Sequence, residues 1–288
     1  MFRDRLAQDA ALIQNHFDKV LGALDNLDVT QAMAYATKGG KRLRGFLVLE
    51  SARLHGVETE RAIWPATAIE ALHAYSLVHD DLPCMDDDDL RRGRPTVHVK
   101  WDEGTAVLAG DALQTLAFEL CGNAQVGEAA IRADLTLTLA RASGAQGMVL
   151  GQALDIAAET AEAPLALEQI TRLQAGKTGA LIEWSACAGA RLAQADADPL
   201  RQYARALGLA FQIADDILDV EGDAEKAGKR LQKDAKAGKA TFVSLLGLDA
   251  AKTRAAELVD QACAALDGYG TAAETLKDAA RFVIARDS

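Results

Sequence analysis

Apolar residues recur every three or four positions along most of the chain, and this spacing predicts a protein built almost entirely of helices. The first helix is expected over residues 2–25, where Leu6, Ile13, Phe17 and Val20 alternate with polar residues. The same pattern predicts further helices over 29–37, 46–54, 60–82, 103–122, 128–142, 144–159, 166–194 and 198–220, with two or three more between 241 and 286. The fold class is therefore expected to be all-α.

Glycines and prolines mark several helix ends. Gly39-Gly40 is expected to end the second helix, and Asp198 and Pro199 to be the N-cap and first residue of a later one. The segment Gly176-Lys177-Thr178-Gly179 interrupts the apolar pattern of 166–194, which indicates a local break in that helix. No linker or shift in composition divides the chain, so we expect one domain over residues 1–288.

The composition supports a helical protein and excludes several classes of function. Half of the 288 residues are hydrophobic and only five are proline. The net charge of −11 argues against nucleic acid as a partner. The four cysteines show neither zinc-ligand nor disulfide spacing. Because the sequence shows no signal peptide and no apolar run long enough to span a bilayer, we expect a soluble, cytoplasmic protein.

An acidic helix end is the first candidate site. Asp80 and Asp81 close the helix 60–82, Pro83 breaks it, and six of the ten residues from 80 to 89 are aspartates. Such carboxylates repel one another, and the negative end of the helix dipole, unless a cation lies among them. Mg²⁺ binds carboxylate oxygens together with substrate phosphates, so these aspartates are expected to hold it. A basic cluster that can receive a polyanion follows, formed by Arg91, Arg92 and Arg94.

A second acidic motif lies 135 residues further along the chain. Asp215 and Asp219 are one turn apart on one helical face, with Asp216 beside them, inside a belt of apolar residues. Unpaired charge in such surroundings is costly, which again indicates a bound cation. Either acidic segment alone is compatible with an ordinary solvated loop or turn. Facing each other across a helical bundle, the two would hold several Mg²⁺ ions around one diphosphate.

Cations accompany both acidic motifs. The glycine-flanked turn Lys41-Arg42-Leu43-Arg44 precedes a helix start, where side chains and backbone N–H groups can meet an anion. His73 and Ser76 share a helical face with Asp80, so His73 is expected to contact a ligand rather than only to pack. A lysine-rich stretch follows the second motif, with Lys226, Lys229, Lys233, Lys236 and Lys239.

In these motifs the chain resembles the trans-isoprenyl diphosphate synthases, and among them the bacterial farnesyl diphosphate synthases. The resemblance covers nearly the whole chain and is carried by Gly39 to Arg44, Glu70 to Asp81, Asp86 to Gly93, Gly151-Gln152, Lys177 to Gly179 and Phe211 to Asp216. It implies an all-α bundle around a deep central cavity, normally homodimeric. It also implies a Mg²⁺-dependent enzyme, with three ions, that joins isopentenyl diphosphate to an allylic diphosphate.

Site residues follow from the resemblance, position by position. The implied Mg²⁺ ligands are Asp80, Asp81, Asp86, Asp215, Asp216 and Asp219. The cations that grip the allylic diphosphate are implied to be Arg91, Lys177, Lys229 and Lys239. The isopentenyl diphosphate site is implied to comprise Lys41, Arg44, His73 and Arg92. Thr178 and Gln212 match positions near the developing carbocation, so the residues expected to act in the chemical step are Arg91, Lys177, Thr178 and Gln212.

Two departures from the family pattern affect these expectations. Gly45 stands where the family usually has proline after the basic turn, and glycine does not pre-set the backbone of a helix start. We therefore expect a looser isopentenyl diphosphate site in this chain. Gln232 stands where many relatives have glycine, which leaves the geometry of the loop 229–239 open.

The product is expected to be the C15 compound, farnesyl diphosphate. In related enzymes, bulky residues four or five positions before the first aspartate stop elongation of the prenyl chain. Tyr75 is the large aromatic residue at those positions here, with Ser76 beside it. A C20, geranylgeranyl, product is the alternative. Two other functions fit the sequence less well. In a class I terpene cyclase, the second basic site would have no role. In a non-catalytic partner subunit, one acidic motif would be incomplete, whereas both motifs are complete here.

Overall fold

The structure is a computed structural model that describes residues 2–161, 163, 165–221 and 241–285. The chain divides into two compact units. The N-terminal unit comprises Met1–Leu137 and Ala188–Ala195, and the C-terminal unit comprises Thr138–Cys187 and Asp196–Ser288. The expectation of one domain over 1–288 stays a prediction. The all-α fold class is confirmed, since the described part of the chain is helical apart from loops and one short hairpin.

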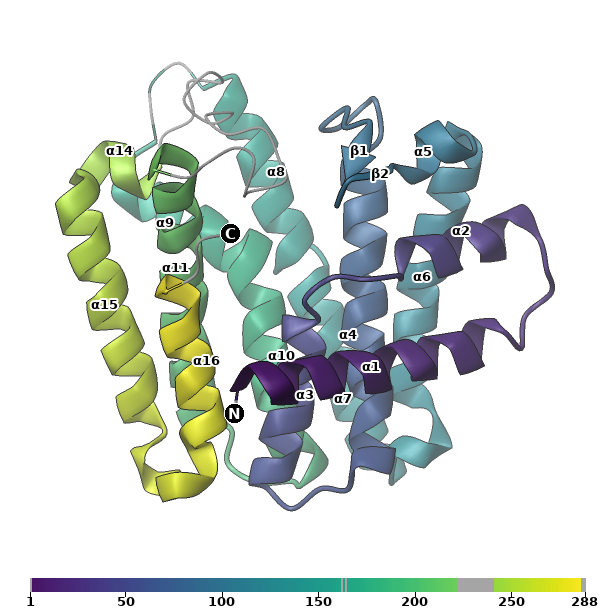
Figure 1. Cartoon of the computed structure of the whole chain (residues 1–288), viewed down its shortest axis with the longest axis horizontal. Helices are drawn as coiled ribbons and strands as arrows, with labels where there is room; N and C mark the ends of the chain where they lie inside the picture. Colours follow the sequence, from purple (N-terminus) through teal and green to yellow (C-terminus); the bar gives the residue numbers. More distant parts are fainter. Residues whose placement is uncertain (1, 162, 164, 222–240, 286–288) are drawn as a thin grey trace. The chain divides into compact units, whose positions relative to one another are not determined.

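The N-terminal unit is organised around a long central helix (Figure 1). Its elements are α1 (Phe2–Leu21), α2 (Asp28–Ala36), α3 (Leu43–Leu54), α4 (Thr59–Asp80), β1 (Leu90–Arg91), β2 (Arg94–Pro95), α5 (Val97–Lys100), α6 (Glu103–Gly122), the 3₁₀ turn η1 (Ala124–Val126) and the first part of α7 (Ala129–Ser143). Helix α4 packs against α3 and α6, and α1 crosses α3 and α4. This packing fixes the carboxyl end of α4, where the first acidic motif begins.

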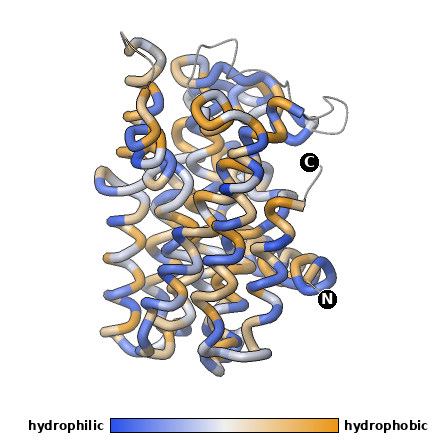
Figure 2. The backbone as a smooth tube through the Cα atoms, turned by 90° about the vertical axis from the view of Figure 1, so that its left-hand side faces the viewer, coloured by the Kyte–Doolittle hydropathy of each residue, from blue (hydrophilic) through white to orange (hydrophobic). Residues whose placement is uncertain are grey.

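Large apolar side chains fill the core of this unit. Phe17, Phe46, Leu72 and Leu113, from four different helices, are fully buried. Burying each of them stabilises the fold by roughly 1.5–3 kcal/mol relative to an exposed position. Figure 2 shows hydrophobic and hydrophilic residues alternating along the turns of the helices. That alternation is the pattern from which the helices were predicted.

The C-terminal unit is built around the helix that carries the second acidic motif. Its elements are α8 (Met148–Glu159), α9 (Leu167–Gln174), the π-helical segment η2 (Ala175–Gly179), most of α10 (Ala180–Leu192), α11 (Asp198–Glu221), α14 (Phe242–Leu246), α15 (Leu248–Ala265), the 3₁₀ segment η3 (Asp267–Ala273) and α16 (Glu274–Ile284). Helix α11 packs against α15 and α16. The buried hydroxyl of Tyr203 on α11 donates a hydrogen bond of 2.8 Å to the carbonyl of Leu276 on α16.

Three details of the predicted elements differ in the structure. The region 166–194 is α9 and α10 joined by the π segment, so the predicted break is a widened helical turn and not an interruption of the chain direction. Asp198 is the first residue of α11 and not its N-cap, because the N–H of Arg201 already donates to the carbonyl of Ala197. A two-stranded hairpin, which the helical pattern did not predict, occupies residues 90–95. None of the described helices has both the length and the apolarity that a bilayer crossing requires.

Candidate active site

The first acidic motif folds back onto the end of α4. After Asp80 the helix stops, and Pro83 cannot continue it. The N–H of Asp86 then donates to the carbonyl of Asp80 at 2.8 Å, and the N–H of Asp88 to the carbonyl of Asp81 at 3.3 Å. These bonds satisfy carbonyls that every helix end leaves without a partner. They also bring the backbone of Asp86 next to that of Asp80, although the two residues are separated by a loop.

Asp81 is held by an arginine of the hairpin. Its carboxylate is buried, and Nε of Arg91 donates to both carboxylate oxygens at 2.8 and 2.9 Å. Burial raises the pKa of Asp81, and the hydrogen bonds and charge of Arg91 oppose that rise. The predicted metal ligand and the predicted diphosphate-binding cation are therefore paired with each other. A charge-assisted contact of this kind fixes both side chains at the carboxyl end of α4.

The hairpin places Arg92 through an unusual backbone conformation. Strand pairs Leu90–Pro95 and Arg91–Arg94 leave Arg92 and Gly93 as a two-residue turn. Both turn residues have positive φ, 53° and 71°, as a type I′ turn requires. Glycine adopts this conformation freely, but arginine does so only at a cost, and such costs concentrate at functional sites. The guanidinium of Arg92 lies directly over Gly40, where a Cβ would come within 2.8 Å of it.

A pocket of about 310 Å³ opens beside this turn within the N-terminal unit. It lies between the segment that follows α2, one face of α4 and the hairpin. Its polar lining includes Lys38, Asp81, Arg91, Arg92 and Arg94, and its apolar lining includes Ala74, Leu77 and Val78. The glycines of the predicted basic turn, Gly39 and Gly40, also line it, with positive φ of 79° and 86°. The pocket thus offers cations and an apolar wall to one small ligand.

His73 projects from α4 among the arginines of this unit. Burial lowers the pKa of His73 well below its usual value, and the positive charges of Arg44, Arg92, Arg91 and Arg42 lower it further. The imidazole is therefore neutral near pH 7 and leaves the positive charge of this region to the arginines. An anion among these groups would interact with several positive charges at once. This surrounding is compatible with the ligand contact predicted for His73, which stays a prediction.

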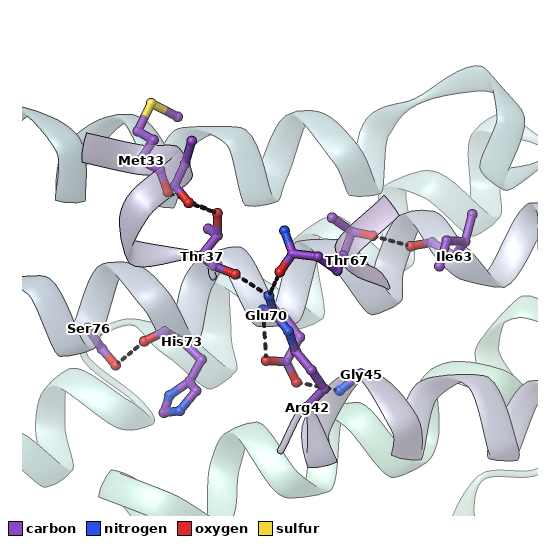
Figure 3. A network of polar contacts seen from close by, with 11 residues as sticks. Met33, Thr37, Arg42, Gly45, Ile63, Thr67, Glu70, His73 and Ser76 are labelled. Atoms are coloured by element: carbon purple, nitrogen blue, oxygen red, sulfur yellow. Dashed lines mark hydrogen bonds and ion pairs between the residues drawn. The ribbon is translucent and has the colours of Figure 1, made fainter. Parts of the chain in front are cut away.

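A buried network supports the basic turn from below (Figure 3). Arg42, also at positive φ, donates to the carbonyl of Thr37 and, at 2.8 Å, to Oε1 of Gln14. Its guanidinium also lies 3.6 Å from Oε2 of the buried Glu70 on α4. Arg42 is thus a structural residue that turns the chain into α3. The neighbouring Lys41 and Arg44 remain the candidates for anion binding in this turn.

Glu70 also binds Gly45, the position at which the chain departs from the family pattern. The N–H of Gly45 donates to Oε1 of Glu70 at 2.8 Å. A Cβ on Gly45 would meet Cδ1 of the fully buried Ile13 at 2.5 Å. A hydrogen bond therefore holds the start of α3. This contact opposes the looser site expected from Gly45.

In the C-terminal unit, the π segment presents Lys177 to a carboxylate of α8. Nζ of Lys177 lies 2.6 Å from Oδ2 of Asp155. The backbone of the segment approaches α8 so closely that a Cβ on Gly151 would lie 2.0 Å from the backbone nitrogen of Lys177. The absence of a side chain at Gly151 thus allows the contact. Widened turns of this kind are frequent at functional sites, because they re-aim side chains within a helix.

The next residue, Thr178, begins a chain of hydrogen bonds that ends at α14. Its hydroxyl lies 3.4 Å from Oε1 of Gln212, and Nε2 of Gln212 lies 3.4 Å from Oδ1 of Asp216. The other oxygen of Asp216 accepts the N–H of Phe242 at 2.7 Å. Asp216 is buried, whereas Asp215 and Asp219 are partly exposed. These contacts favour a role within the protein for Asp216 over the predicted role as a metal ligand.

The donor atoms suit Mg²⁺ in the manner in which it binds with phosphates. Asp80, Asp86, Asp215 and Asp219 offer the hard oxygen ligands that Mg²⁺ prefers. Within the described residues, however, no group of three or more acidic, histidine or cysteine side chains forms a ready metal cage. One or two carboxylates completed by substrate oxygens is the usual arrangement for this ion. Lys229 and Lys239, which were predicted to bind the allylic diphosphate, and the departure at Gln232 lie outside the described residues.

Comparison with known proteins identifies the family. The family model for polyprenyl synthetase matches residues 27–277. The chain belongs to the polyprenyl synthetase family. It is 50% identical over 245 residues to the farnesyl diphosphate synthase of Escherichia coli (strain K12), a match that covers 82% of this chain and 81% of that protein.

Two further relatives show the range of this family. The chloroplastic geranylgeranyl pyrophosphate synthase of Capsicum annuum is 40% identical over 273 residues, covering 93% of this chain and 74% of that protein. The crystal structure of an FPP/GFPP synthase from Zymomonas mobilis matches with a TM-score of 0.91 at 46% identity, covering 98% of each chain. The predicted family resemblance is therefore confirmed.

Within this polyprenyl synthetase, two contacts of predicted site residues were not foreseen from the sequence. Asp155 follows the motif Gly151-Gln152 by three residues, and this spacing puts it on the same face of α8 as Gln152. Glu70 begins one of the motifs that carry the family resemblance. Both are carboxylates within largely apolar helices, and this signal was available in the sequence. The partner of each carboxylate was not evident, because Lys177 and Gly45 are more than twenty residues away.

Tyr75 and Ser76 lie on α4 below the acidic motif. The Tyr75 ring packs edge-on against His79, with ring centroids 5.1 Å apart, and its hydroxyl forms a hydrogen bond with Gln114 of α6. Burial raises the pKa of the Tyr75 hydroxyl. The hydroxyl of Ser76 donates to the carbonyl of His73 at 3.0 Å (Figure 3). Contacts with His79 and Gln114 thus fix the position of the Tyr75 ring, and its role in chain length stays a prediction.

Proposed function

We propose that this chain is a farnesyl diphosphate synthase, which condenses isopentenyl diphosphate with dimethylallyl or geranyl diphosphate. The observation that carries the proposal is that cations of the N-terminal unit lie both against the acidic motif and around His73. Arg91 is paired with Asp81 of the motif, and together with Arg44 and Arg92 it is among the charges that act on the neutral His73. This arrangement suits a reaction with two diphosphate substrates. The 50% identity to the Escherichia coli enzyme supports the same reaction.

The allylic diphosphate is proposed to bind at the acidic motifs. Bound Mg²⁺, three ions in our proposal, would neutralise the diphosphate as it departs. Arg91 and Lys177 donate hydrogen bonds to the diphosphate oxygens, and Lys229 and Lys239 add positive charge. The carboxylates now paired with these cations, Asp81 and Asp155, can then hold metal or orient the cation. Asp80, Asp86, Asp215 and Asp219 complete the proposed set of metal ligands, whereas both carboxylate oxygens of Asp216 accept hydrogen bonds from protein groups.

Isopentenyl diphosphate is proposed to bind among Lys41, Arg44, His73 and Arg92. Its diphosphate carries the charge that these groups are arranged to meet, and fixed cations hold the alkene close to the allylic carbon. Arg92 adopts a strained backbone conformation with positive φ, because its side chain projects towards this site from a tight turn. Because this site keeps its diphosphate through the reaction, it needs no metal of its own.

The chemical step needs no protein nucleophile. The bond between C1 of the allylic substrate and the diphosphate oxygen breaks, and the electron pair leaves with the diphosphate. The alkene of isopentenyl diphosphate attacks the allylic cation, a carbon–carbon bond forms, and a proton passes to the departing diphosphate. The oxygens of Thr178 and Gln212 stabilise the positive charge while it lasts.

Product length is proposed to stop at C15 because the bulky ring of Tyr75, five residues before Asp80 on α4, would block further growth of the prenyl chain. The farnesyl assignment is better supported than the C20 alternative, since the 50% identical relative is named for the farnesyl product and the geranylgeranyl relative is 40% identical. The test is incubation of the purified protein with Mg²⁺, isopentenyl diphosphate and geranyl diphosphate, followed by chain-length analysis. A C15 product is expected. A product of C20 would refute the farnesyl assignment, and a cyclic hydrocarbon would refute prenyl transfer.

The protein is further proposed to be a cytoplasmic homodimer. Val107 and Leu108 of α6 expose 40% and 59% of their surface, which suits a contact with a second copy of the chain. Leu108→Glu is expected to convert the dimer to a monomer in sedimentation experiments, because it places a charge in the proposed interface. A wild-type monomer, or a Leu108→Glu dimer, would refute this interface.

A further inference from the structure

The second acidic motif contains one aspartate whose surroundings differ from those of the other two. Asp216 exposes 6% of its surface, and each of its carboxylate oxygens already has a protein donor. Oδ2 accepts the N–H of Phe242 at 2.7 Å, and Oδ1 accepts Nε2 of Gln212 at 3.4 Å. The N–H of Phe242 is one of those that a helix start cannot satisfy within the helix. Asp216 thus joins α11 to the start of α14.

The carboxylate of Asp216 determines how the amide of Gln212 is oriented. An ionised carboxylate can only accept hydrogen bonds, whereas a glutamine amide has a donating NH₂ group and an accepting oxygen. Gln212 must therefore turn its NH₂ group towards Asp216. Its oxygen, Oε1, then points towards the hydroxyl of Thr178, 3.4 Å away.

The orientation of Gln212 in turn fixes the hydroxyl proton of Thr178. Because Oε1 of Gln212 can only accept, Thr178 must donate its proton to it. The lone pairs of the Thr178 oxygen are then directed elsewhere. A reversed amide would present N–H groups to Thr178, and positively polarised hydrogens near a carbocation would destabilise it.

We propose that Asp216 is a positioning residue that orients Gln212 and, through it, Thr178, so that oxygen lone pairs face the developing carbocation. This inference rests on the proposed prenyl transfer and replaces the predicted role of Asp216 as a metal ligand. Asp216 itself touches no substrate. Its effect on the reaction passes through two hydrogen bonds, both within the C-terminal unit.

Asp216→Asn changes the direction of the hydrogen bonds from residue 216 to Thr178 while keeping the shape of the side chain. The new side chain has the same outline, but its single oxygen must accept the N–H of Phe242. Its NH₂ group then faces Gln212, whose amide has to reverse, and the direction of every hydrogen bond up to Thr178 reverses with it. We expect kcat to fall roughly tenfold to a hundredfold. We expect the KM values of both substrates and the Mg²⁺ concentration at half-maximal rate to stay within about threefold. The variant removes no contact that binds the substrates equally in the ground state and the transition state.

The double variant Asp216→Asn with Gln212→Glu tests the direction of the bonds at constant net charge. The carboxylate introduced at position 212 would accept both from the amide introduced at position 216 and from Thr178, so Thr178 again donates. Recovery of at least tenfold in kcat over Asp216→Asn supports the proposal. An unchanged kcat in the single variant, or no recovery in the double variant, refutes it. A large rise in the Mg²⁺ requirement of Asp216→Asn would instead establish Asp216 as a metal ligand.

NMR of the side-chain amide of Gln212 tests the proposed orientation without any enzymatic turnover. In ¹⁵N-labelled protein, the side-chain amide signal of Gln212 is assigned by its loss in Gln212→Glu. It should move in Asp216→Asn and stay in place in Thr178→Val, because the NH₂ group donates to Asp216 and not to Thr178. The opposite pattern overturns the proposed orientation. If these signals behave as expected but the wild type forms no prenyl product, the proposed function fails and the orientation stands.

Discussion

Nζ of Lys177 lies 2.6 Å from Oδ2 of Asp155, so the cation proposed to grip the diphosphate already has an anionic partner within the protein. The side chains are partly buried, at 30% and 17% exposed, and the contact is therefore less screened than a surface ion pair. A diphosphate must share Lys177 with Asp155 or displace it.

Asp155→Asn is expected to increase the affinity for inorganic diphosphate in the presence of Mg²⁺ by roughly threefold to tenfold, because a competing negative charge is removed while a hydrogen-bond acceptor remains. Isothermal titration calorimetry measures this affinity directly. Glu257→Gln is the matched control, since it makes the same charge change in an exposed ion pair with Arg254. Equal gains in both variants would show a general charge effect, and weaker binding in Asp155→Asn would contradict the competition.

Loss of either acidic motif should abolish turnover. Asp80→Ala or Asp215→Ala removes a proposed ligand to the metal that stabilises the leaving diphosphate, so kcat is expected to fall by about two orders of magnitude or more. Neither variant should lower the midpoint of thermal unfolding in metal-free buffer, because repulsion between neighbouring carboxylates decreases. Steady-state kinetics and unfolding of both variants test this. Near-normal activity in either one would refute the two-motif mechanism.

Introducing proline at position 45, the residue expected there from the family resemblance, should destabilise this chain. Gly45→Pro removes the N–H that Glu70 binds at 2.8 Å and leaves a buried carboxylate with one donor fewer. The free energy of unfolding should fall by about 1–3 kcal/mol, as measured by urea denaturation. Gly45→Ala keeps the N–H and is expected to cost less, since its Cβ meets the flexible end of Ile13.

Combining Gly45→Pro with Ile13→Val relieves the contact with Ile13 but does not restore the hydrogen bond to Glu70, and the carbonyl oxygen of Ala66 remains 3.1 Å from the added Cβ. The destabilisation should therefore persist in the double variant. Full recovery there would show that steric crowding by Ile13, and not Glu70, is the reason that glycine occupies this position.

The lowered pKa of His73 predicts a pH dependence of stability. Below pH 6.5 the unfolded chain protonates this imidazole, whereas the folded protein does not until a lower pH. The contribution of His73 is therefore complete above 6.5, and it is lost as the pH falls from that value towards the lowered pKa. In His73→Gln, the free energy of unfolding should decline less steeply between about pH 6.5 and 5.

His16→Gln serves as the comparison for His73. Burial and the charge of Lys19 also lower the pKa of His16, but by less than for His73. Its removal should change the slope of stability against pH by a smaller amount. Identical slopes in His73→Gln and the wild type would mean that burial and the neighbouring arginines do not lower the pKa of His73.

Tyr75→Ala should lengthen the product. Removal of the ring opens the cavity along α4, and the product is expected to shift from C15 towards C20, with little change in the first condensation. Tyr75→Phe keeps the ring and loses only the hydrogen bond with Gln114, so its product should stay at C15. Chain-length analysis of the two variants compares them directly. A C15 product from Tyr75→Ala would assign chain length to other walls of the cavity.

The helices were predictable from sequence because their apolar periodicity is strong and their ends carry local signals. The predicted helix 103–122 is observed with the same bounds, and α4 stops before Pro83 as expected. The hairpin at 90–95 was not predicted, because each strand has only two residues and no alternating pattern can form in that length. Its turn, Arg92-Gly93, lacks the asparagine that usually marks a type I′ turn.

The types of residue in the candidate site were predictable, but their pairing was not. From the sequence alone, Asp216 is equivalent to Asp215 because both are aspartates in one motif. Consecutive helix residues point about 100° apart, and only Asp216 turns into the core towards Phe242. In the same way Arg42, Lys41 and Arg44 form one basic run, yet only Arg42 is buried against Glu70. Such distinctions depend on tertiary packing, which spacing along the chain does not determine.

The pairing of Asp81 with Arg91 has a consequence for selectivity in a cell that is rich in free ions. Before any ligand arrives, the two charges cancel, so the pair offers little attraction to a lone metal ion or a lone anion. A metal ion alone would take Asp81 from Arg91 and leave this arginine only the charges of Asp80 and Asp88, and an anion alone would take Arg91 from the buried Asp81. A metal–diphosphate complex supplies both charges in one event. The pair therefore favours binding of the metal ion and the diphosphate together over binding of either one alone.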